Sequence, residues 1–328
     1  MERRGFVIFL CAAGSGLQGF ARAQNNRVRR IGMFLAGSAQ DPEMQLRVKV
    51  FVQTLNELGW IEGRNLRIEY RFGNAEIDRY PKYAAELLAW EPDVLVASAS
   101  NVTRALQKAT HSVPIVFATA TDPVGGGLVA SLARPGANVT GLSQRDFSLT
   151  AKSLELLKQV VPTVAHVAVL RDPTTAGGGG QLGAIQAVAP SLGVDVTPVD
   201  VHDPAEIESS LAAFARHPHA GLVVTTSALG ISHRSLIVKL AAQYHLPAAY
   251  PVALFVTAGG LLSYGPDQVQ AYRETARYVD RILKGEKPAN MPVQQPTKFE
   301  FVLNLKTARA LAITVPHSIL QRADRVIE

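Results

Sequence analysis

The stretch from residue 115 to residue 143 constrains the fold of this chain more than any other. It begins with an apolar, β-branched run that ends in small hydroxyl residues, Thr119 and Thr121. A break at Asp122 follows, then three glycines, a short apolar segment at 128–132 that predicts a helix, and a second apolar run. A strand, a polar tip, a helix and a second strand form one βαβ unit, so we expect a parallel sheet.

The same alternation continues along the chain. Apolar runs that predict strands begin near residues 30, 65, 93, 114 and 138, and again near 165, 194, 221, 247 and 261. Segments with helical periodicity separate most of them, which indicates an α/β protein with two doubly wound parallel-sheet lobes. A long amphipathic segment at 267–284, a proline-containing connector at 287–296 and a further strand at 299–305 indicate that the chain crosses between the lobes more than once.

We expect one N-terminal lobe made of residues 28–142 plus 266–296. The C-terminal lobe then comprises residues 143–265 plus 297–328. The crossings between the lobes are predicted near 142–147, 263–266 and 292–298.

Composition is that of a folded protein that does not bind nucleic acid. The chain has 328 residues, of which 47% are hydrophobic and 18% charged, which suits two ordinary globular domains. The net charge of +6 is mild, and no dense run of Lys and Arg with interleaved aromatic residues occurs.

The first residues predict export. Two arginines, an apolar stretch at 5–17 and an Ala-x-Ala pattern ending at Ala23 indicate a signal peptide at 1–23 that is cleaved after Ala23. The alternatives are a disordered tail, a first helix, or a lipid anchor on Cys11, which the bulky Leu10 before it disfavours. Cys11 is the only cysteine, so the exported chain, expected in the periplasm, has neither a disulfide nor a thiol nucleophile.

A search for catalytic chemistry finds little. None of the eight histidines has zinc-ligand spacing, and the pair His217 and His219 reads as a solvated turn. No G-x-S-x-G supports a hydrolase, and the glycines at 125–127 lack the pattern of a nucleotide-binding loop, so a tight turn is favoured there. The glycines at 177–180 predict a flexible loop. We therefore expect no catalytic residue, no metal site and no cofactor.

The predicted strand ends share small polar residues. Short hydroxyl groups and free backbone N–H groups at helix starts bind a carboxylate without burying a full charge, which suits an amino-acid-like ligand. Asp122 is either a helix cap or a ligand contact, and Tyr264 is a candidate hinge residue. The candidate ligand-binding residues are Gly37, Ser38, Ser98, Ser100, Asn101, Thr119, Thr121, Asp122, Ser143, Asp172, Thr226, Ser227, Tyr250 and Tyr264.

Several segments also carry a family resemblance. They are DPVGGGLVASLARPGANVTGL (122–142), LNELGWIEGRNLRIEYRF (55–72), GGLLSYGPD (259–267), the stretch 278–313 and the ending ADRVIE (323–328). The chain resembles the bacterial ABC-transporter substrate-binding proteins, a group that includes tryptophan- and tyrosine-binding members. It departs from them at Asp172, where the family more often has Asn before the proline.

The resemblance implies a type I periplasmic binding protein fold, the Venus flytrap, whose lobes close on a ligand by hinge bending. It further implies a receptor that delivers a small, amino-acid-like ligand, aromatic in some members of the family, to an ABC permease and its ATPase subunits at the inner membrane. A monomer is expected.

Two other functions stay open at this point. One is a secreted α/β enzyme, such as a hydrolase acting on a small carboxylate, and it needs a nucleophile or base pair that the residues do not supply. The other is the effector domain of a transcription regulator, which needs a helix-turn-helix where residues 1–28 look like a signal.

Overall fold

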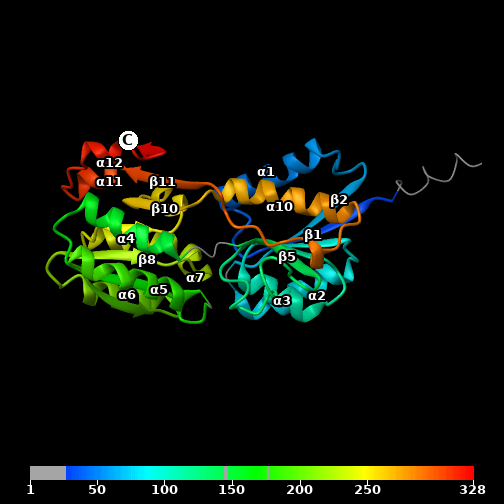
Figure 1. Cartoon of the computed structure of the whole chain (residues 1–328), viewed down its shortest axis with the longest axis horizontal. Coiled ribbons are helices and arrows are strands. Elements are labelled where there is room, and N and C mark those ends of the chain that lie inside the picture. The colour runs from blue at the N-terminus through cyan, green and yellow to red at the C-terminus, as the bar shows by residue number, and fades with distance from the viewer. Residues whose placement is uncertain (1–26, 75, 144–146, 176) are drawn as a thin grey trace, which may run out of the picture.

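The computed structural model describes residues 27–74, 76–143, 147–175 and 177–328. The predicted signal peptide, residues 1–23, lies outside the described residues. Figure 1 shows two α/β lobes side by side, each built on one sheet. Among the described residues, no helix is long and apolar enough to cross a membrane.

The N-lobe is a five-stranded, wholly parallel sheet with helices on both faces. Its strand order is β2-β1-β3-β4-β5. Helices α1 and α10 cover one face, and α2 and α3 cover the other (Figure 1). The elements are β1 (Arg29–Leu35), α1 (Pro42–Glu57), β2 (Leu66–Phe72), η2 (Ile77–Arg79), α2 (Tyr80–Ala89), β3 (Val94–Ala97), α3 (Ser100–Ala109), β4 (Ile115–Ala120), β5 (Val139–Ser143), α10 (Gln268–Leu283) and η4 (Pro288–Asn290).

The C-lobe is a seven-stranded sheet with the order β12-β11-β10-β9-β8-β6-β7. Only the β10–β11 pair is antiparallel. The elements are α4 (Ser148–Val160), β6 (His166–Arg171), α5 (Gly178–Val188), η3 (Ala189–Leu192), β7 (Asp195–Asp200), α6 (Pro204–Phe214), β8 (Ala220–Val224), α7 (Ala228–Ser232), α8 (Arg234–Gln243), β9 (Ala248–Tyr250), α9 (Ala253–Thr257), β10 (Leu262–Pro266), β11 (Phe299–Asn304), α11 (Leu305–Ala310), α12 (His317–Leu320) and β12 (Arg325–Ile327).

The chain passes between the two sheets three times: after β5, after β10, and between η4 and β11 (Figure 1). The third passage runs beside the first, because the Ser143 N–H donates to the Gln294 carbonyl at 2.7 Å. It also runs beside the second, where the Asp267 N–H donates to the Lys298 carbonyl at 3.2 Å. The residue boundaries assigned to the lobes stay a prediction.

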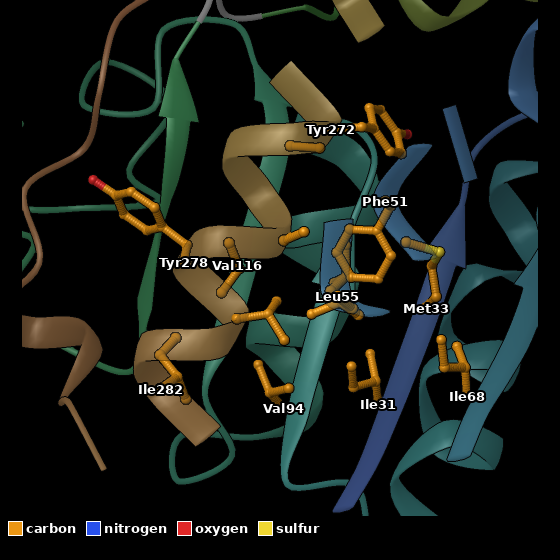
Figure 2. Close-up of a cluster of buried hydrophobic side chains, with 14 of the residues drawn as sticks. Ile31, Met33, Phe51, Leu55, Ile68, Val94, Val116, Tyr272, Tyr278 and Ile282 are labelled. Atoms are coloured by element: carbon orange, nitrogen blue, oxygen red, sulfur yellow. The ribbon is translucent and has the colours of Figure 1, made fainter. Parts of the chain in front are cut away.

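Helix α10 belongs to the N-lobe although it follows a C-lobe strand directly. Its buried residues recur at helical spacing, so one apolar stripe faces the sheet. Figure 2 shows this stripe packed beside Phe51 and Leu55 of α1 and Met33 of β1. Each buried side chain of this size contributes about 1.5–3 kcal/mol, which is enough to hold the helix on this lobe. The Asp267 carboxylate caps it by accepting from the Gln270 N–H at 3.0 Å.

The helix predicted at 128–132 is wrong. These residues form irregular bends after a turn at 123–127, with Leu128 and Val129 buried in the N-lobe core. Their N–H groups both donate to the Pro123 carbonyl, and the Ala130 N–H donates to the Pro135 carbonyl, so the backbone is satisfied without a helix. The segment is too short, between a glycine turn and a proline, to complete the turns that a stable helix needs.

Two further differences concern the C-lobe. The glycines at 178–180 form the first turn of α5 instead of a flexible loop. The sheet is not wholly parallel, because β11 enters it directly from the other lobe and runs against β10. A last strand, β12, pairs with β11 through only three residues, which is too short for its alternation to be recognised in the sequence.

Two core tyrosines allow a matched test of this packing. The Tyr80 hydroxyl is buried and has no hydrogen-bond partner among the described residues, whereas the Tyr278 hydroxyl donates to the Pro292 carbonyl at 2.5 Å. An orphaned buried hydroxyl opposes folding and a paired one stabilises it. We expect Tyr80→Phe to leave the free energy of unfolding unchanged or raise it by up to about 1 kcal/mol, and Tyr278→Phe to lower it by about 1 kcal/mol.

Urea denaturation of both variants measures this difference. A larger loss for Tyr80→Phe than for Tyr278→Phe would contradict the packing described.

Candidate functional site

A cavity of about 440 Å³ lies between the lobes. The segments that follow β1, β3 and β4 line it from the N-lobe, and those that follow β6 and β8 line it from the C-lobe. The carboxyl ends of both sheets therefore face one space, which is where open α/β sheets bind ligands. Its volume is within the range of small-molecule sites.

Ten of the fourteen residues predicted from the sequence line this cavity. They share a position at or just after the end of a strand. They are Gly37, Ser38, Ser98, Ser100, Asn101, Thr119, Thr121, Asp172, Thr226 and Ser227. Asn101 lies in the first turn of α3 and does not cap it, since the helix begins one residue earlier.

The N-lobe hydroxyls brace the strand ends against each other. Ser98 Oγ accepts from the Ala36 N–H at 2.7 Å, and Ser100 Oγ accepts from the Thr121 N–H at 3.0 Å. Thr119 Oγ1 donates to the Ser98 carbonyl. These bonds connect the ends of β1, β3 and β4 and fix the positions of the hydroxyl groups on this wall of the cavity.

The C-lobe wall is held in a similar way. Asp172 accepts from the N–H of Thr174 at 2.9 Å and from its hydroxyl at 2.6 Å. Gln181 of α5 accepts from the Thr226 N–H at 2.8 Å, and Ser227 Oγ accepts from the Gly230 N–H at 2.9 Å as the cap of α7.

One ion pair joins the lobes across the cavity. Arg234 of α8 lies 3.1 Å from Asp41, whose other oxygen caps α1 by accepting from the Glu43 N–H at 3.1 Å. The Arg234 and Asp41 side chains are only 19% and 9% exposed, so water screens this pair less than a surface pair.

A close backbone approach joins the lobes at a second point. A Cβ atom on Gly177 would lie 2.4 Å from Cγ2 of Thr121 in the other lobe, which is far inside normal contact. A side chain there would push Thr121 away. The absence of a side chain at Gly177, just before α5, therefore allows this contact between the lobes.

Sequence reasoning missed Arg47, Met44 and Tyr272, which also line the cavity. Met44 and Arg47 lie on the stripe of α1 that includes Phe51 and Leu55, so a cation interrupting an apolar stripe was the available signal. Burial raises the pKa of the Tyr272 hydroxyl from 10.0 to about 12, and the smaller influences of Arg47 and a Ser98 hydrogen bond oppose it. Tyr272 is thus neutral at physiological pH and can donate a hydrogen bond.

The other four predicted residues do not reach the cavity wall. Ser143 is fully buried below it, and its N–H is used by Gln294. Tyr250 is 1% exposed and stacks on Phe255, with ring centroids 4.9 Å apart. Tyr264 packs near the crossings, stacked on Phe299.

Asp122 is a turn residue. Its φ is 45°, a left-handed conformation that Asp tolerates, and its Oδ1 accepts from the Gly125 N–H at 3.0 Å. Of the two alternatives left open by the sequence, this geometry favours capping, although the capped segment is a turn and not a helix.

A second cavity of similar volume lies at the amino ends of the C-lobe strands, lined by His217, His219 and His245 among others. Ligands of α/β sheets bind at the opposite ends, which argues against a function there. Nowhere in the described chain do three or more His, Cys, Asp or Glu side chains gather in a way that could hold a metal ion.

Comparison with known proteins gives one family. Residues 36–327 match the model of the family described as ABC transporter substrate binding protein. A curated relative, the tyrosine-binding protein of Clostridioides difficile, is 23% identical over 290 residues, which are 88% of this chain and 83% of the relative.

Two solved structures are similar over almost their whole length. The ABC domain from Streptococcus pneumonia in complex with L-Trp superposes with a TM-score of 0.85 at 27% identity, covering 91% of this chain and 99% of that one. A conserved domain protein from Vibrio cholerae also has a TM-score of 0.85, at 28% identity, covering 92% and 100%. These likenesses confirm the predicted type I Venus-flytrap fold.

The ion pair between the lobes leads to a test. Arg234→Ala leaves Asp41 without its cation, so we expect the equilibrium between closed and open lobes to shift toward open by about 1.5–3 kcal/mol, the contribution of a hydrogen bond to a charged group. Small-angle X-ray scattering should show a larger radius of gyration for the ligand-free variant.

Arg171→Ala is the matched control. Arg171 pairs with Asp200 inside the C-lobe, so its loss should not move the lobes. Equal radii for Arg234→Ala and the control would show that the pair does not hold the lobes together.

Proposed function

Because the chain belongs to the family of ABC transporter substrate-binding proteins, we propose that it is the solute receptor of an ABC importer. It captures a small, amino-acid-like ligand between its lobes, with aromatic amino acids as the first candidates. It then presents the closed complex to a membrane permease, where ATPase subunits drive uptake. The observation that carries this proposal is the cavity at the facing strand ends, lined by small hydroxyl residues of both lobes.

The relatives support the amino-acid part of the proposal. The curated relative is a tyrosine-binding protein, and the pneumococcal domain holds L-Trp. Family members are substrate-binding proteins and not enzymes, so we propose that this chain has no catalytic activity, in contrast to the alternative of a secreted hydrolase.

Proteins of this family are typically extracytoplasmic. We propose that residues 1–23 direct export to the periplasm and are then removed. Mass spectrometry of periplasmic material should find a chain that begins at Gln24, and a full-length product retained in the cytoplasm would contradict the receptor role.

The ligand itself is found by a thermal-shift screen of residues 24–328 against the L-amino acids. A ligand that binds only the folded state adds ~2.7 kcal/mol to the free energy of unfolding at 100 times its Kd, which raises the melting temperature measurably. We expect L-tyrosine, L-tryptophan or a close relative to give the largest shift, with the affinity then measured by titration calorimetry.

A receptor that delivers its ligand releases it unchanged. Chromatography of the incubated ligand should therefore recover it intact. Conversion to a product would favour the secreted enzyme, and no shift with any amino acid would remove amino acids from the proposal.

A further inference from the structure

The cavity contains a cation that no described residue neutralises. Three arginines line it. Arg104 donates to the Gly126 carbonyl at 2.7 Å, and Arg234 pairs with Asp41. Arg47 forms no hydrogen bond or ion pair with any described residue. Arg104 keeps its charge but is held by a neutral carbonyl, so among these three arginines Arg47 is the one with its hydrogen-bonding groups unused by the described chain.

Arg47 is also deeply buried. The residue is 6% exposed, and its Nε atom is inaccessible and has no hydrogen-bond partner in the part of the chain that the structure describes. Leaving a buried charged donor unpaired is costly, and native proteins do so rarely. The free-energy cost of burying the unpaired Arg47 guanidinium is explained if the charge is needed for function. A bound anion would pair with the guanidinium and offset that cost.

We propose that Arg47 is the anion-binding residue of the cleft, and that the ligand bears a single carboxylate which pairs with its guanidinium. This inference rests on the proposed function, since it names the charge of the ligand at the same site. The planar guanidinium fork matches a carboxylate and binds it through two parallel hydrogen bonds. The neutral Tyr272 hydroxyl and Ser98, which line the same cavity, add hydrogen-bonding groups.

The surroundings favour a carboxylate over a phosphate. Arg47 is the one arginine of the described lining with neither a hydrogen bond nor an ion pair, whereas Arg104 is already engaged by the Gly126 carbonyl. Apolar side chains also contribute to the wall, namely Met44, Ile77, Ile231 and Leu254. A ligand with an apolar surface and one negatively charged end fits a cavity that has an unpaired arginine and an apolar wall.

The test compares carboxylates with their neutral amides. Titration calorimetry measures acetate, propionate, benzoate and 3-(4-hydroxyphenyl)propionate against the four matching primary amides, with L-tyrosine and L-tryptophan measured beside them. The protein variants are wild type, Arg47→Gln, Arg47→Lys and, as a control outside the cleft, Arg67→Gln, which makes the same chemical change at an exposed position of β2 in the same lobe.

Wild type and Arg67→Gln should bind at least one carboxylate about 10-fold or more tightly than its amide, the difference expected for a hydrogen bond to a charged group. Arg47→Gln should lose this preference, and Arg47→Lys should retain part of it. A preference that survives in Arg47→Gln overturns the inference, as does failure of every carboxylate and both amino acids to bind wild type.

The outcome also separates this inference from the proposed function. If L-tyrosine or L-tryptophan binds wild type and Arg47→Gln equally well, the receptor for amino acids stands and the role of Arg47 falls. If only carboxylates without an amino group bind, and do so through Arg47, the inference stands and the amino-acid part of the function falls.

The melting temperature of the ligand-free protein gives a second test of the role of Arg47. Replacing the unpaired cation by an apolar chain of similar length removes a buried charge, so Arg47→Met should raise the melting temperature of the ligand-free protein by about 2 °C or more. A fall in melting temperature relative to wild type would mean that Arg47 holds the N-lobe together, and would overturn its assignment as a group kept for the ligand.

Discussion

All three passages between the lobes lie at the edge where the strands of each sheet end, and the rest of the structure depends on this constraint. Because β5 and β10 both leave their sheets at the carboxyl edge, the two edges are kept facing each other. The free ends of strands, with their small polar residues and helix starts, then enclose a common cavity. Any motion of the passages changes the width of that cavity directly, which is the property a solute receptor needs.

Two different kinds of contact act on that motion. The passages run side by side and are hydrogen-bonded, as between Ser143 and Gln294, so a hinge motion of one passage is coupled to the others. Farther from them, the Asp41–Arg234 ion pair and the Gly177–Thr121 contact bring the lobes together. Forming an ion pair with little exposure requires the removal of water from both charges, and this cost is offset only when the geometry is good. The Asp41–Arg234 pair therefore favours one relative position of the lobes over others more than it raises the overall free energy of unfolding.

The sequence predicts most of this architecture because its signals are local. Apolar strands, helix periodicity and small polar residues after each strand are properties of short segments, and ten of the candidate residues chosen from them line the cavity; that they bind the ligand stays a prediction. The helix predicted at 128–132 does not form, because its apolar pattern is too short to stabilise a helix against an irregular backbone. Tyr250 is predicted at the site but does not line the cavity. An aromatic residue near a strand end can equally well stack inside the core, as Tyr250 does on Phe255.

The remaining features depend on tertiary structure. Nothing in the sequence brings Asp41 to Arg234, which are almost two hundred residues apart and lie in different lobes. Arg47 had a visible signal, a cation on the buried face of an amphipathic helix. The role of Arg47 can be argued only from the folded structure, in which Arg47 and Tyr272 of α10 line the same cavity and interact electrostatically.

The lobes are expected to close over a small ligand held between their strand ends. Spin labels on cysteines introduced at Lys49 of α1 and Lys239 of α8, both exposed, measure the separation of the lobes by pulsed electron resonance, and no native cysteine follows Cys11. Closure of the lobes predicts that saturation with the ligand of highest affinity shifts the distance distribution to shorter values and narrows it. An identical distribution with and without a ligand that calorimetry shows to be bound would contradict it.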